Sequence, residues 1–347
     1  MMKVVFFNIP HLSVQRGGEF WERRVIEYLN SLGEIKASLI TTDCCLVSEI
    51  KPNFDYDVIK FKKLLFFNLY DFNELYQKIQ DADILYYFNS FVGSQIPLLI
   101  NREKIKAKLV LGYHAKNDWN FLQRMYYRLL DFKMKNIGYH HVLTEYQSNL
   151  LKKRGYKNVF IIPNFINLSE FNLNKEDKSF REIVAPGATT IEKGIDTLLF
   201  VSKYFSDIKF YITGREISYK LPDNVIFSGQ LNREKYIELL KRTSICLLPT
   251  RGETFSISLL ECMAAGNLIV TRDLPVLREV SRNAETVFFS RKNQDFIMNI
   301  KKALSLAHAE IPAQKSIDVA KMYDENVVLK KLYEKLISIG EGQQAGG

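Results

Sequence analysis

Short apolar runs alternate with helical patterns along this chain of 347 residues. Runs such as Lys3–Pro10 and Lys108–Ala115 have the length and apolar content of buried strands, and amphipathic segments separate them. This alternation is typical of βαβ units with parallel sheets. Because 47% of the residues are apolar and 25% are charged, the composition is globular, and the length suits two domains. We therefore predict a two-domain α/β protein.

Two glutamates, Glu253 and Glu261, lie in the segment that bears most on function. Glu253 lies in a loop beside Gly252, and Glu261 lies in an apolar helical stretch that ends at Gly266. Their spacing corresponds to about two helical turns, so we expect both carboxylates to face the same side, near a helix N-terminus that favours anions. Carboxylates accept hydrogen bonds from hydroxyl groups. The pattern therefore indicates a diphosphate pocket with a sugar or ribose at each end.

The same segment resembles the Glu-x7-Glu signature of retaining, nucleotide-sugar-dependent glycosyltransferases with the GT-B fold. This group includes glycogen synthase-like and phosphatidylinositol mannosyltransferase-like enzymes. The resemblance implies that Glu253 faces the transferred sugar and that Glu261 binds the ribose hydroxyls. The competing interpretation is a solvated Glu253 and a Glu261 on a helix face. The resemblance extends from about Lys3 to Tyr333 and implies two Rossmann-like domains with parallel sheets facing across a cleft.

A strand, a pair of glycines and an amphipathic helix follow one another near the start of the chain. Gly17 and Gly18 are expected to form a turn before a helix that ends near Gly33. This order is the phosphate-approach arrangement of nucleotide-binding α/β folds. It resembles the Gly-Gly loop with which the family's first domain faces the donor phosphate. A Gly-Gly pair by itself is an ordinary turn.

Three histidines lie in or at the end of strand-like runs. His114 ends the run from Lys108, and the family carries a histidine at this place, near the reacting carbon of the sugar and the acceptor. Histidine titrates near neutral pH and can donate to a hydroxyl or move a proton. The alternative is a strand-end histidine bonded to the backbone. We interpret His140 and His141 as structural, because adjacent strand residues point to opposite faces.

The second domain is expected to begin at about Pro163. The segment there resembles the family's interdomain pattern P-N-G-V-D, with Phe165 in place of glycine and Asn167 in place of aspartate. The polar stretch Asn172–Glu182 then predicts a linker or loop.

These boundaries give an N-terminal acceptor-side domain over residues 1–163 and a C-terminal nucleotide-sugar-binding domain over residues 164–321. A helix over residues 322–340 is expected to pack back on the first domain, as the GT-B resemblance implies. Residues 341–347 have low complexity and are predicted to be disordered.

The second domain resembles the family pattern of a strand, Gly-Arg, a short loop, Lys-Gly and a helix. Gly187 and Lys193 match this pattern, but Ala188 stands where the family has arginine. In the family that arginine and the lysine together hold the departing diphosphate, because cations stabilise the charge that develops in the transition state. The loss implies weaker phosphate binding, replacement by Arg215 or Arg251, or an altered donor.

Two further strand-like runs, Phe210–Glu216 and Val225–Leu231, resemble the strand ends that hold the nucleobase. The resemblance implies that no metal and no cofactor are needed, since the nucleotide-diphospho-sugar is a substrate. The predicted catalytic residues are His114, Lys193 and Glu253. The predicted donor-binding residues are Gly17, Gly18, Gly187, Lys193, Arg215, Leu231, Glu253, Thr254, Phe255, Ser256 and Glu261.

The cysteines Cys44, Cys45, Cys246 and Cys262 have no zinc-site spacing. We interpret Cys246 and Cys262, which lie in apolar runs, as buried thiols. With no signal peptide and no membrane-spanning run in the sequence, we expect a reduced, cytoplasmic protein.

The formal net charge is +9, and two basic stretches, residues 60–70 and 121–135, carry interleaved aromatic residues. Such segments can lie at an anionic membrane surface, which predicts peripheral contact with the inner face of the cell membrane and a lipid-linked acceptor. For residues 121–135 the alternative is a core-facing helix with a solvated basic face. The excess charge is too small and too scattered to indicate a nucleic-acid partner.

Taken with the resemblance, these features predict a retaining, metal-independent glycosyltransferase. It would move a sugar from a nucleotide-diphospho-sugar to an acceptor hydroxyl on a lipid-linked or cell-surface glycan. The implied mechanism is departure and attack on one face of the sugar, with the departing phosphate taking the acceptor's proton. One alternative is a catalytically silent nucleotide-sugar-binding protein, which the replacement of the family arginine by Ala188 favours. The other is a GT-B nucleotide-sugar epimerase.

Overall fold

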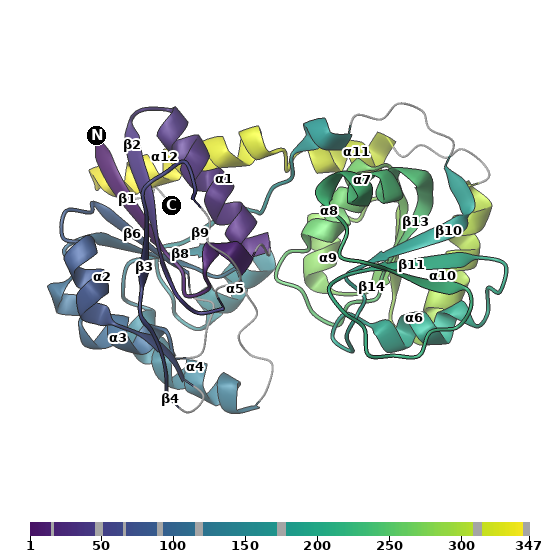
Figure 1. Ribbon diagram of the computed structural model, residues 1–347, viewed down its shortest axis with the longest axis horizontal. Coiled ribbons are helices and arrows are strands. Elements are labelled where there is room, and N and C mark those ends of the chain that lie inside the picture. Colours follow the sequence, from purple (N-terminus) through teal and green to yellow (C-terminus); the bar gives the residue numbers. More distant parts are fainter. Residues whose placement is uncertain are drawn as a thin grey trace. The chain divides into compact units, whose positions relative to one another are not determined.

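The computed structural model describes residues 1–14, 17–45, 51–64, 67–88, 93–114, 121–171, 178–307 and 314–342. The chain divides into two compact units (Figure 1). Unit 1 comprises Met1–Pro163 and Leu329–Gly347, and unit 2 comprises Asn164–Val328. Each unit is built around one parallel sheet, which confirms the predicted fold class. The predicted disordered tail lies, from residue 343 onward, outside the described residues.

The sheet of unit 1 has seven parallel strands in the order β3-β2-β1-β6-β7-β8-β9. All five residues of β6 are buried, as expected for a central strand of a parallel sheet. The strands are β1 (Met2–Phe7), β2 (Ile35–Thr42), β3 (Tyr56–Ile59), β6 (Ile84–Phe88), β7 (Lys108–Gly112), β8 (Tyr139–Val142) and β9 (Val159–Ile161).

The helices of unit 1 follow its strands in sequence. Asp71 caps α2 by accepting from two backbone N–H groups, and Thr144 caps α5 by accepting from the N–H of Gln147, which satisfies donors that lack a partner inside the helix. The helices are α1 (Gly17–Ser31), α2 (Phe72–Lys78), α3 (Gln95–Ile100), α4 (Phe121–Met134) and α5 (Glu145–Lys153), with short turns η1 (Leu12–Val14) and η2 (Arg102–Lys104).

An antiparallel hairpin of β4 (Phe61–Leu64) and β5 (Phe67–Tyr70) lies outside the main sheet of unit 1. The ring centroids of Phe67 in β5 and Tyr126 in α4 are 5.8 Å apart. The hairpin and α4 are therefore neighbours, although about 60 residues separate them in the sequence.

The sheet of unit 2 has six parallel strands in the order β12-β11-β10-β13-β14-β15. Apolar side chains of its central strands pack against α6 and α10 to form the core. The strands are β10 (Ser179–Pro186), β11 (Lys209–Thr213), β12 (Val225–Gly229), β13 (Thr243–Leu248), β14 (Leu268–Arg272) and β15 (Val287–Ser290). The helices are η3 (Leu168–Phe171), α6 (Ile195–Ser202), α7 (Arg233–Arg242), α8 (Ile257–Ala264), α9 (Pro275–Val280), α10 (Asn293–Ala307) and α11 (Gln314–Lys321).

The predicted linker at residues 172–182 is wrong in its second part, because β10 begins at Ser179. The first four residues of β10 are exposed or half-buried, whereas its last four are buried. Because the start of the strand is largely solvated, its polar residues are the same as those of a loop, and the sequence does not distinguish the two. Residues 172–177 lie outside the described part of the chain.

The last helix, α12 (Glu325–Glu341), belongs to unit 1 from Leu329 onward. The Lys108 ammonium group donates to the carbonyl oxygens of Ile339 and Gly340, at 2.8 and 2.9 Å. A cation at the C-terminus of a helix also interacts favourably with the helix dipole. These contacts hold the end of α12 against the start of β7.

Gly194 controls the approach of two loops of unit 2. It precedes α6 with a φ of +83°, a conformation that side-chain-bearing residues rarely adopt. A Cβ atom there would lie 2.4 Å from the carbonyl oxygen of Pro249, which follows β13. Only glycine therefore allows the loop after β10 to lie this close to the loop after β13.

Replacing Gly194 with alanine is expected to destabilise unit 2, because it adds both strain and a clash with the backbone. We expect a loss of about 2–4 kcal/mol in the free energy of unfolding, measured by urea denaturation. The control is Gly229→Ala, where φ is +70° but nothing lies within 4 Å of the added Cβ. There we expect about 1 kcal/mol from strain. Equal losses in the two variants would show that the contact with Pro249 relaxes.

Candidate functional site

The order of the strands in unit 2 creates a site at one edge of its sheet. From β10 the chain continues to β11 on one side, and later it returns through β13 on the other side. Ligands of open α/β sheets bind outside the carboxyl ends of the strands at such a switch point, because the loops leave in opposite directions. Here these loops are residues 187–194 after β10 and residues 249–256 after β13. Most of the predicted donor-binding residues lie on them.

An ion pair between Lys193 and Glu253 joins the two loops. The Lys193 Nζ is 2.7 Å from the Glu253 Oε1. The Glu253 side chain is 15% exposed and the Lys193 side chain 45% exposed, so the carboxylate is the less accessible partner. From the sequence, these residues were expected to contact different parts of the donor. The structure brings them together, with a partly exposed cation beside a mostly buried carboxylate.

Arg251 adds a further link between the two loops and a link to the start of α6. Its backbone N–H donates to the carbonyl oxygen of Glu192 at 2.8 Å, and its guanidinium group is 2.5 Å from a carboxylate oxygen of Asp196. The positions of Lys193 and Glu253 are therefore supported by neighbouring contacts. This support favours a defined site over two independent solvated side chains.

Ala188, which stands where the family has arginine, is 1% exposed and packs in the core of unit 2. Of the two suggested replacements, Arg251 lies at the loop pair, whereas Arg215 is exposed after β11, one strand away. Arg272, at the end of β14, was missed by the sequence analysis. Its guanidinium group donates to Thr197 at 3.1 Å and to the carbonyl oxygen of Pro249 at 3.3 Å. Burial, followed by repulsion from Arg251, lowers the pKa of Arg272.

Glu261 lies on α8 and is 6% exposed. One carboxylate oxygen accepts from the guanidinium group of Arg233, and the other accepts from the hydroxyl of Tyr236 at 2.9 Å. Arg233 also pairs with Glu170, at 2.5 Å. Burial alone would lower the pKa of Arg233, but attraction by Glu261 and Glu170 outweighs it and raises the pKa. Arg233 and Tyr236 begin α7 and were not predicted, because no sequence spacing relates them to Glu261.

As expected, Glu253 lies in a loop and Glu261 lies in a helix, but counting helical turns between them does not apply, because only Glu261 is helical. Helix α8 begins at Ile257, so Glu253 lies before it. Ser256 adopts a φ of +81° and caps the helix by accepting from the N–H of Leu259 at 3.3 Å. This left-handed residue lies between Glu253 and Glu261, which have different partners, Lys193 and Arg233.

The side chain of Phe255 is 1% exposed and packs edge-on against Tyr323, with the ring centroids 5.6 Å apart. It therefore belongs to the core, and only its backbone remains for a donor contact. Leu231 follows β12, two strands from the switch point. The structure thus groups Gly187, Lys193, Glu253, Thr254 and Ser256 on the central loops and places Arg215 and Leu231 further along the sheet.

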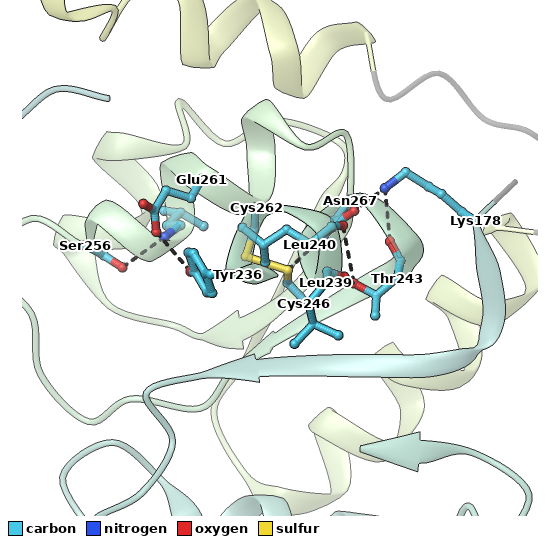
Figure 2. Close-up of a disulfide and its surroundings, with 11 residues drawn as sticks. Lys178, Tyr236, Leu239, Leu240, Thr243, Cys246, Ser256, Glu261, Cys262 and Asn267 are labelled. Carbon is cyan, nitrogen blue, oxygen red and sulfur yellow. Dashed lines mark hydrogen bonds between the residues drawn. A yellow bond between two sulfur atoms is a disulfide. The ribbon is translucent and has the colours of Figure 1, made fainter. Parts of the chain in front are cut away.

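Cys246 of β13 and Cys262 of α8 form a disulfide, with their Cα atoms 6.3 Å apart (Figure 2). The prediction of buried reduced thiols is therefore wrong for this pair, although both residues are buried. The sequence spacing does not indicate the bond, since a strand, a loop and a helix must first fold back on one another. Figure 2 shows the disulfide beside Glu261, which precedes Cys262 on α8.

His114 lies just after β7 in unit 1, and its Nε2 is 2.8 Å from the hydroxyl of Tyr86. Its ring also packs on Trp21 and Phe88, with centroids 4.5 and 4.8 Å away. Side chains of three aromatic residues therefore help to hold the histidine. Trp21 and Tyr86 were not predicted as part of this site.

The expected Gly17-Gly18 turn is wrong, because α1 already begins at Gly17. Residues 15–16, which precede the pair, lie outside the described residues. A Cβ added to Gly18 would meet no atom within 4 Å. Open space at the first turn of α1 is compatible with the predicted approach of a phosphate, which stays a prediction.

His140 and His141 are both fully buried in β8. His140 contacts the hydroxyl of Tyr113 at 3.2 Å through Nδ1, whereas His141 contacts Tyr86 and the carbonyl oxygen of Ile162. Burial lowers the pKa of each histidine to about 4, so both are neutral at pH 7. His141 nevertheless contacts Tyr86, whose hydroxyl also contacts His114.

No group of three or more His, Cys, Asp or Glu side chains that could hold a metal ion occurs in the described ranges. The expectation that neither a metal nor a cofactor is required stays a prediction.

Comparison with known proteins identifies the class of fold and domain. Residues 168–317, which lie in unit 2, match the family model described as glycosyl transferases group 1. The solved structure of HepE from Anabaena, in complex with UDP and glucose, has a TM-score of 0.75 at 12% identity and covers 97% of this chain and 100% of that chain. Together with the parallel sheets, this likeness shows the GT-B fold.

Two curated relatives are similar in sequence. The O-antigen chain mannosyltransferase RfbU of Salmonella typhimurium is 26% identical over 205 residues, which are 54% of this chain and 56% of that protein. The alpha-galactosylglucosyldiacylglycerol synthase of Streptococcus pneumoniae is 24% identical over 218 residues, which are 52% of this chain and 56% of that protein. The chain therefore spans about half the length of the curated relatives it matches.

Replacing Arg233 with methionine is expected to lower the free energy of unfolding by about 1–3 kcal/mol, because it leaves the Glu261 carboxylate without its cation. In the Glu261→Gln background, the same replacement is expected to have a clearly smaller effect. Urea denaturation of the four proteins at neutral pH measures this coupling. The control is Lys315→Met, which removes an exposed ion pair with Glu285 and should leave stability unchanged. Strictly additive effects would contradict the coupling between Arg233 and Glu261.

Proposed function

We propose that this protein is a retaining glycosyltransferase that uses a nucleotide-diphospho-sugar donor. The observation that carries the proposal is the Lys193–Glu253 contact at the switch point between β10 and β13. A cation and a carboxylate at this edge suit a ligand with a diphosphate next to a sugar, since the cation attracts the phosphate and the carboxylate accepts from sugar hydroxyls.

Each charged residue has a role that follows from its surroundings. Lys193 is half-exposed and can turn from Glu253 toward the diphosphate, where it would stabilise the leaving group. Glu253 would then accept hydrogen bonds from the sugar hydroxyls. Glu261 is held by Arg233 and Tyr236, and each of its oxygens keeps a second lone pair for a ribose hydroxyl.

The reaction would proceed on one face of the sugar. The bond from the anomeric carbon to the phosphate oxygen lengthens as the acceptor hydroxyl approaches from the same side. The departing phosphate takes the acceptor's proton, and the configuration at the anomeric carbon is retained. His114 in unit 1 is the proposed contact for the sugar or the acceptor hydroxyl.

The relatives favour a glycan or lipid-linked acceptor. Their names refer to an O-antigen chain in one case and to a glycosylated diacylglycerol in the other. The neighbour HepE was solved with UDP and glucose, which makes UDP-sugars the first donors to test. We therefore extend the proposal to a UDP-sugar donor and an acceptor on or near a membrane lipid.

The outer face of α4 supports contact with a membrane. Met125, Leu129 and Phe132 lie four and three residues apart and are 46%, 76% and 77% exposed, so they form one apolar stripe. Arg128 and Lys133 are exposed on the same helix. α4 also faces the core through Met134, as in the alternative of a core-facing helix, but its exposed face carries this apolar stripe as well as basic residues. An amphipathic helix with these properties binds in the plane of an anionic membrane surface.

The neighbouring hairpin extends this surface. Lys62, Lys63 and Leu64 of β4 are exposed, and Leu64 is 59% exposed. Both basic stretches singled out in the sequence therefore lie next to each other in unit 1. None of the described helices is long and apolar enough to cross a membrane. We propose peripheral binding, at the cytoplasmic face, through α4 and the hairpin.

A donor screen tests the proposed activity. The protein is incubated with UDP-, GDP- and ADP-sugars, with and without a lipid extract, and release of the nucleoside diphosphate is followed. We expect release from one donor, stimulated by the extract, and a product with the anomeric configuration of the donor. Glu253→Gln and Lys193→Met are expected to lower kcat by about 100-fold or more, because both groups act on developing charge. Glu261→Gln should mainly raise the donor KM.

Lys315→Met, a loss of an exposed lysine elsewhere in unit 2, is the control and should keep full activity. Nucleotide binding without release from any donor would reject the transferase and favour a silent binding protein. Conversion of the donor to another nucleotide-sugar without an acceptor would instead indicate an epimerase.

Sedimentation with vesicles tests the membrane surface. We expect binding to phosphatidylcholine vesicles that contain phosphatidylglycerol, weakened by added salt because charges contribute. The double variant Leu129→Asp/Phe132→Asp should bind at least about tenfold more weakly, since it places charges in the apolar stripe. The control is Met298→Asp, which changes an exposed apolar residue of unit 2. Equal binding of all three proteins would contradict the role of α4.

A further inference from the structure

A chain of hydrogen bonds runs from His114 into the core of unit 1. The His114 Nε2 is 2.8 Å from the Tyr86 hydroxyl, which also bonds the Nδ1 of His141. The His141 Nε2 is in turn 2.7 Å from the carbonyl oxygen of Ile162. The links come from the end of β7, from β6, from β8 and from the residue that follows β9. The chain therefore crosses four strands of one sheet.

The far end of this chain determines where each proton lies. A carbonyl oxygen only accepts, so the His141 Nε2 must carry a hydrogen. His141 is neutral at pH 7, because burial lowers its pKa to about 4, and its Nδ1 must therefore accept. The Tyr86 hydroxyl donates to that nitrogen and is left to accept from His114. The Nε2 of His114 consequently carries a hydrogen.

The packing leaves the links little freedom. Tyr86 and His141 are fully buried, and burial, followed by the nearby Glu22, raises the pKa of Tyr86 well above its ordinary value, so its hydroxyl keeps its proton. Gly112 makes room for the contact. A Cβ at Gly112 would lie 2.6 Å from the Tyr86 hydroxyl oxygen and 3.0 Å from the His114 ring.

We propose that Tyr86 and His141 are positioning residues that hold His114 as its Nε2–H tautomer, so that Nδ1 is the nitrogen that accepts. Any hydrogen bond that Nδ1 makes to a neutral hydroxyl is then one in which the hydroxyl donates. Its use in sugar transfer rests on the function proposed above. The tautomer itself does not, because it follows from the ligand-free protein.

Nitrogen NMR tests the tautomer without any substrate. The chain has five histidines, so selective ¹⁵N-histidine labelling gives a tractable spectrum. His114→Gln and His141→Gln identify the two sets of signals. At pH 7.5 the ring correlations of both residues should show the hydrogen on Nε2 and none on Nδ1. An Nδ1–H form of His114 in the unmodified protein would overturn the proposal, whether or not any variant folds.

Tyr86→Phe tests the link itself. Without the hydroxyl, His114 should lose its preference for the Nε2–H tautomer, and its signals should shift toward an average of both tautomers. Gly112→Ala, which displaces the hydroxyl, should produce the same change. The matched control is Tyr87→Phe, since Tyr87 is an equally buried neighbour whose hydroxyl donates to the carbonyl oxygen of Ser94. An unchanged His114 spectrum in Tyr86→Phe would reject the role of Tyr86.

Kinetics with the donor found in the screen then test whether the His114 tautomer contributes to sugar transfer. Tyr86→Phe is expected to lower kcat about 10- to 100-fold with little change in the donor KM, whereas Tyr87→Phe should leave both within about twofold. Equal losses in the two variants would indicate a merely structural role. If no donor is turned over, the proposed function fails, and the NMR result still decides the tautomer.

Discussion

β10 and β13 pair in parallel at the centre of the second sheet, and the positions of the candidate donor residues follow from this pairing. The loops that leave these two strands diverge, so space remains at the carboxyl edge between them. Gly194 lets one loop approach Pro249 of the other. Lys193 and Glu253 then come within 2.7 Å, although 60 residues separate them in the sequence. A change in this pairing would separate the two charges.

The ion pairs of unit 2 differ in how readily one partner can be replaced by another group. Glu261 is almost fully buried, and the loss of Arg233 would leave it without a cation in a poorly solvated place. The pair of Lys193 and Glu253 is more exposed on the lysine side. An ion pair with an exposed partner contributes little to stability. Under the proposed function, a diphosphate could therefore take the place of Glu253 beside Lys193 at little cost, whereas Arg233 would keep Glu261 in position for the ribose.

Unit 1 is organised differently, through neutral hydrogen bonds. His140, His141 and Tyr86 are buried in its sheet, and burial keeps all three uncharged at neutral pH. Among the described residues, His114 packs on the aromatic rings of Trp21 and Phe88, whereas the loops of unit 2 carry charges. Under the proposed function this contrast is reasonable, because an acceptor hydroxyl is neutral and a nucleotide diphosphate is anionic.

The sequence by itself determined the fold class, since the alternation of strand-like and helical runs reports burial along the chain, and the fold that it predicts is confirmed. It also indicated that Lys193, Glu253 and Glu261 belong to one domain. It placed Glu253 in a loop and Glu261 in a helix, as observed, but it did not indicate the left-handed Ser256 that caps α8, because one backbone conformation leaves no pattern in apolar periodicity. The strand that begins in the polar stretch at Ser179 was also missed. Its first half is not buried, and periodicity reports only burial.

Only the tertiary structure decided which residues meet. Arg233 and Tyr236 reach Glu261, Cys246 bonds Cys262, and Tyr86 joins His114 to His141 across parallel strands. Parallel strands require long crossover connections, so neighbours in the sheet are distant in the sequence. Periodicity records whether a side chain is buried but carries no information about its partner. The sequence thus determined what kind of fold forms and which loops carry charge, whereas the packing of the crossovers decided the contacts that make a site.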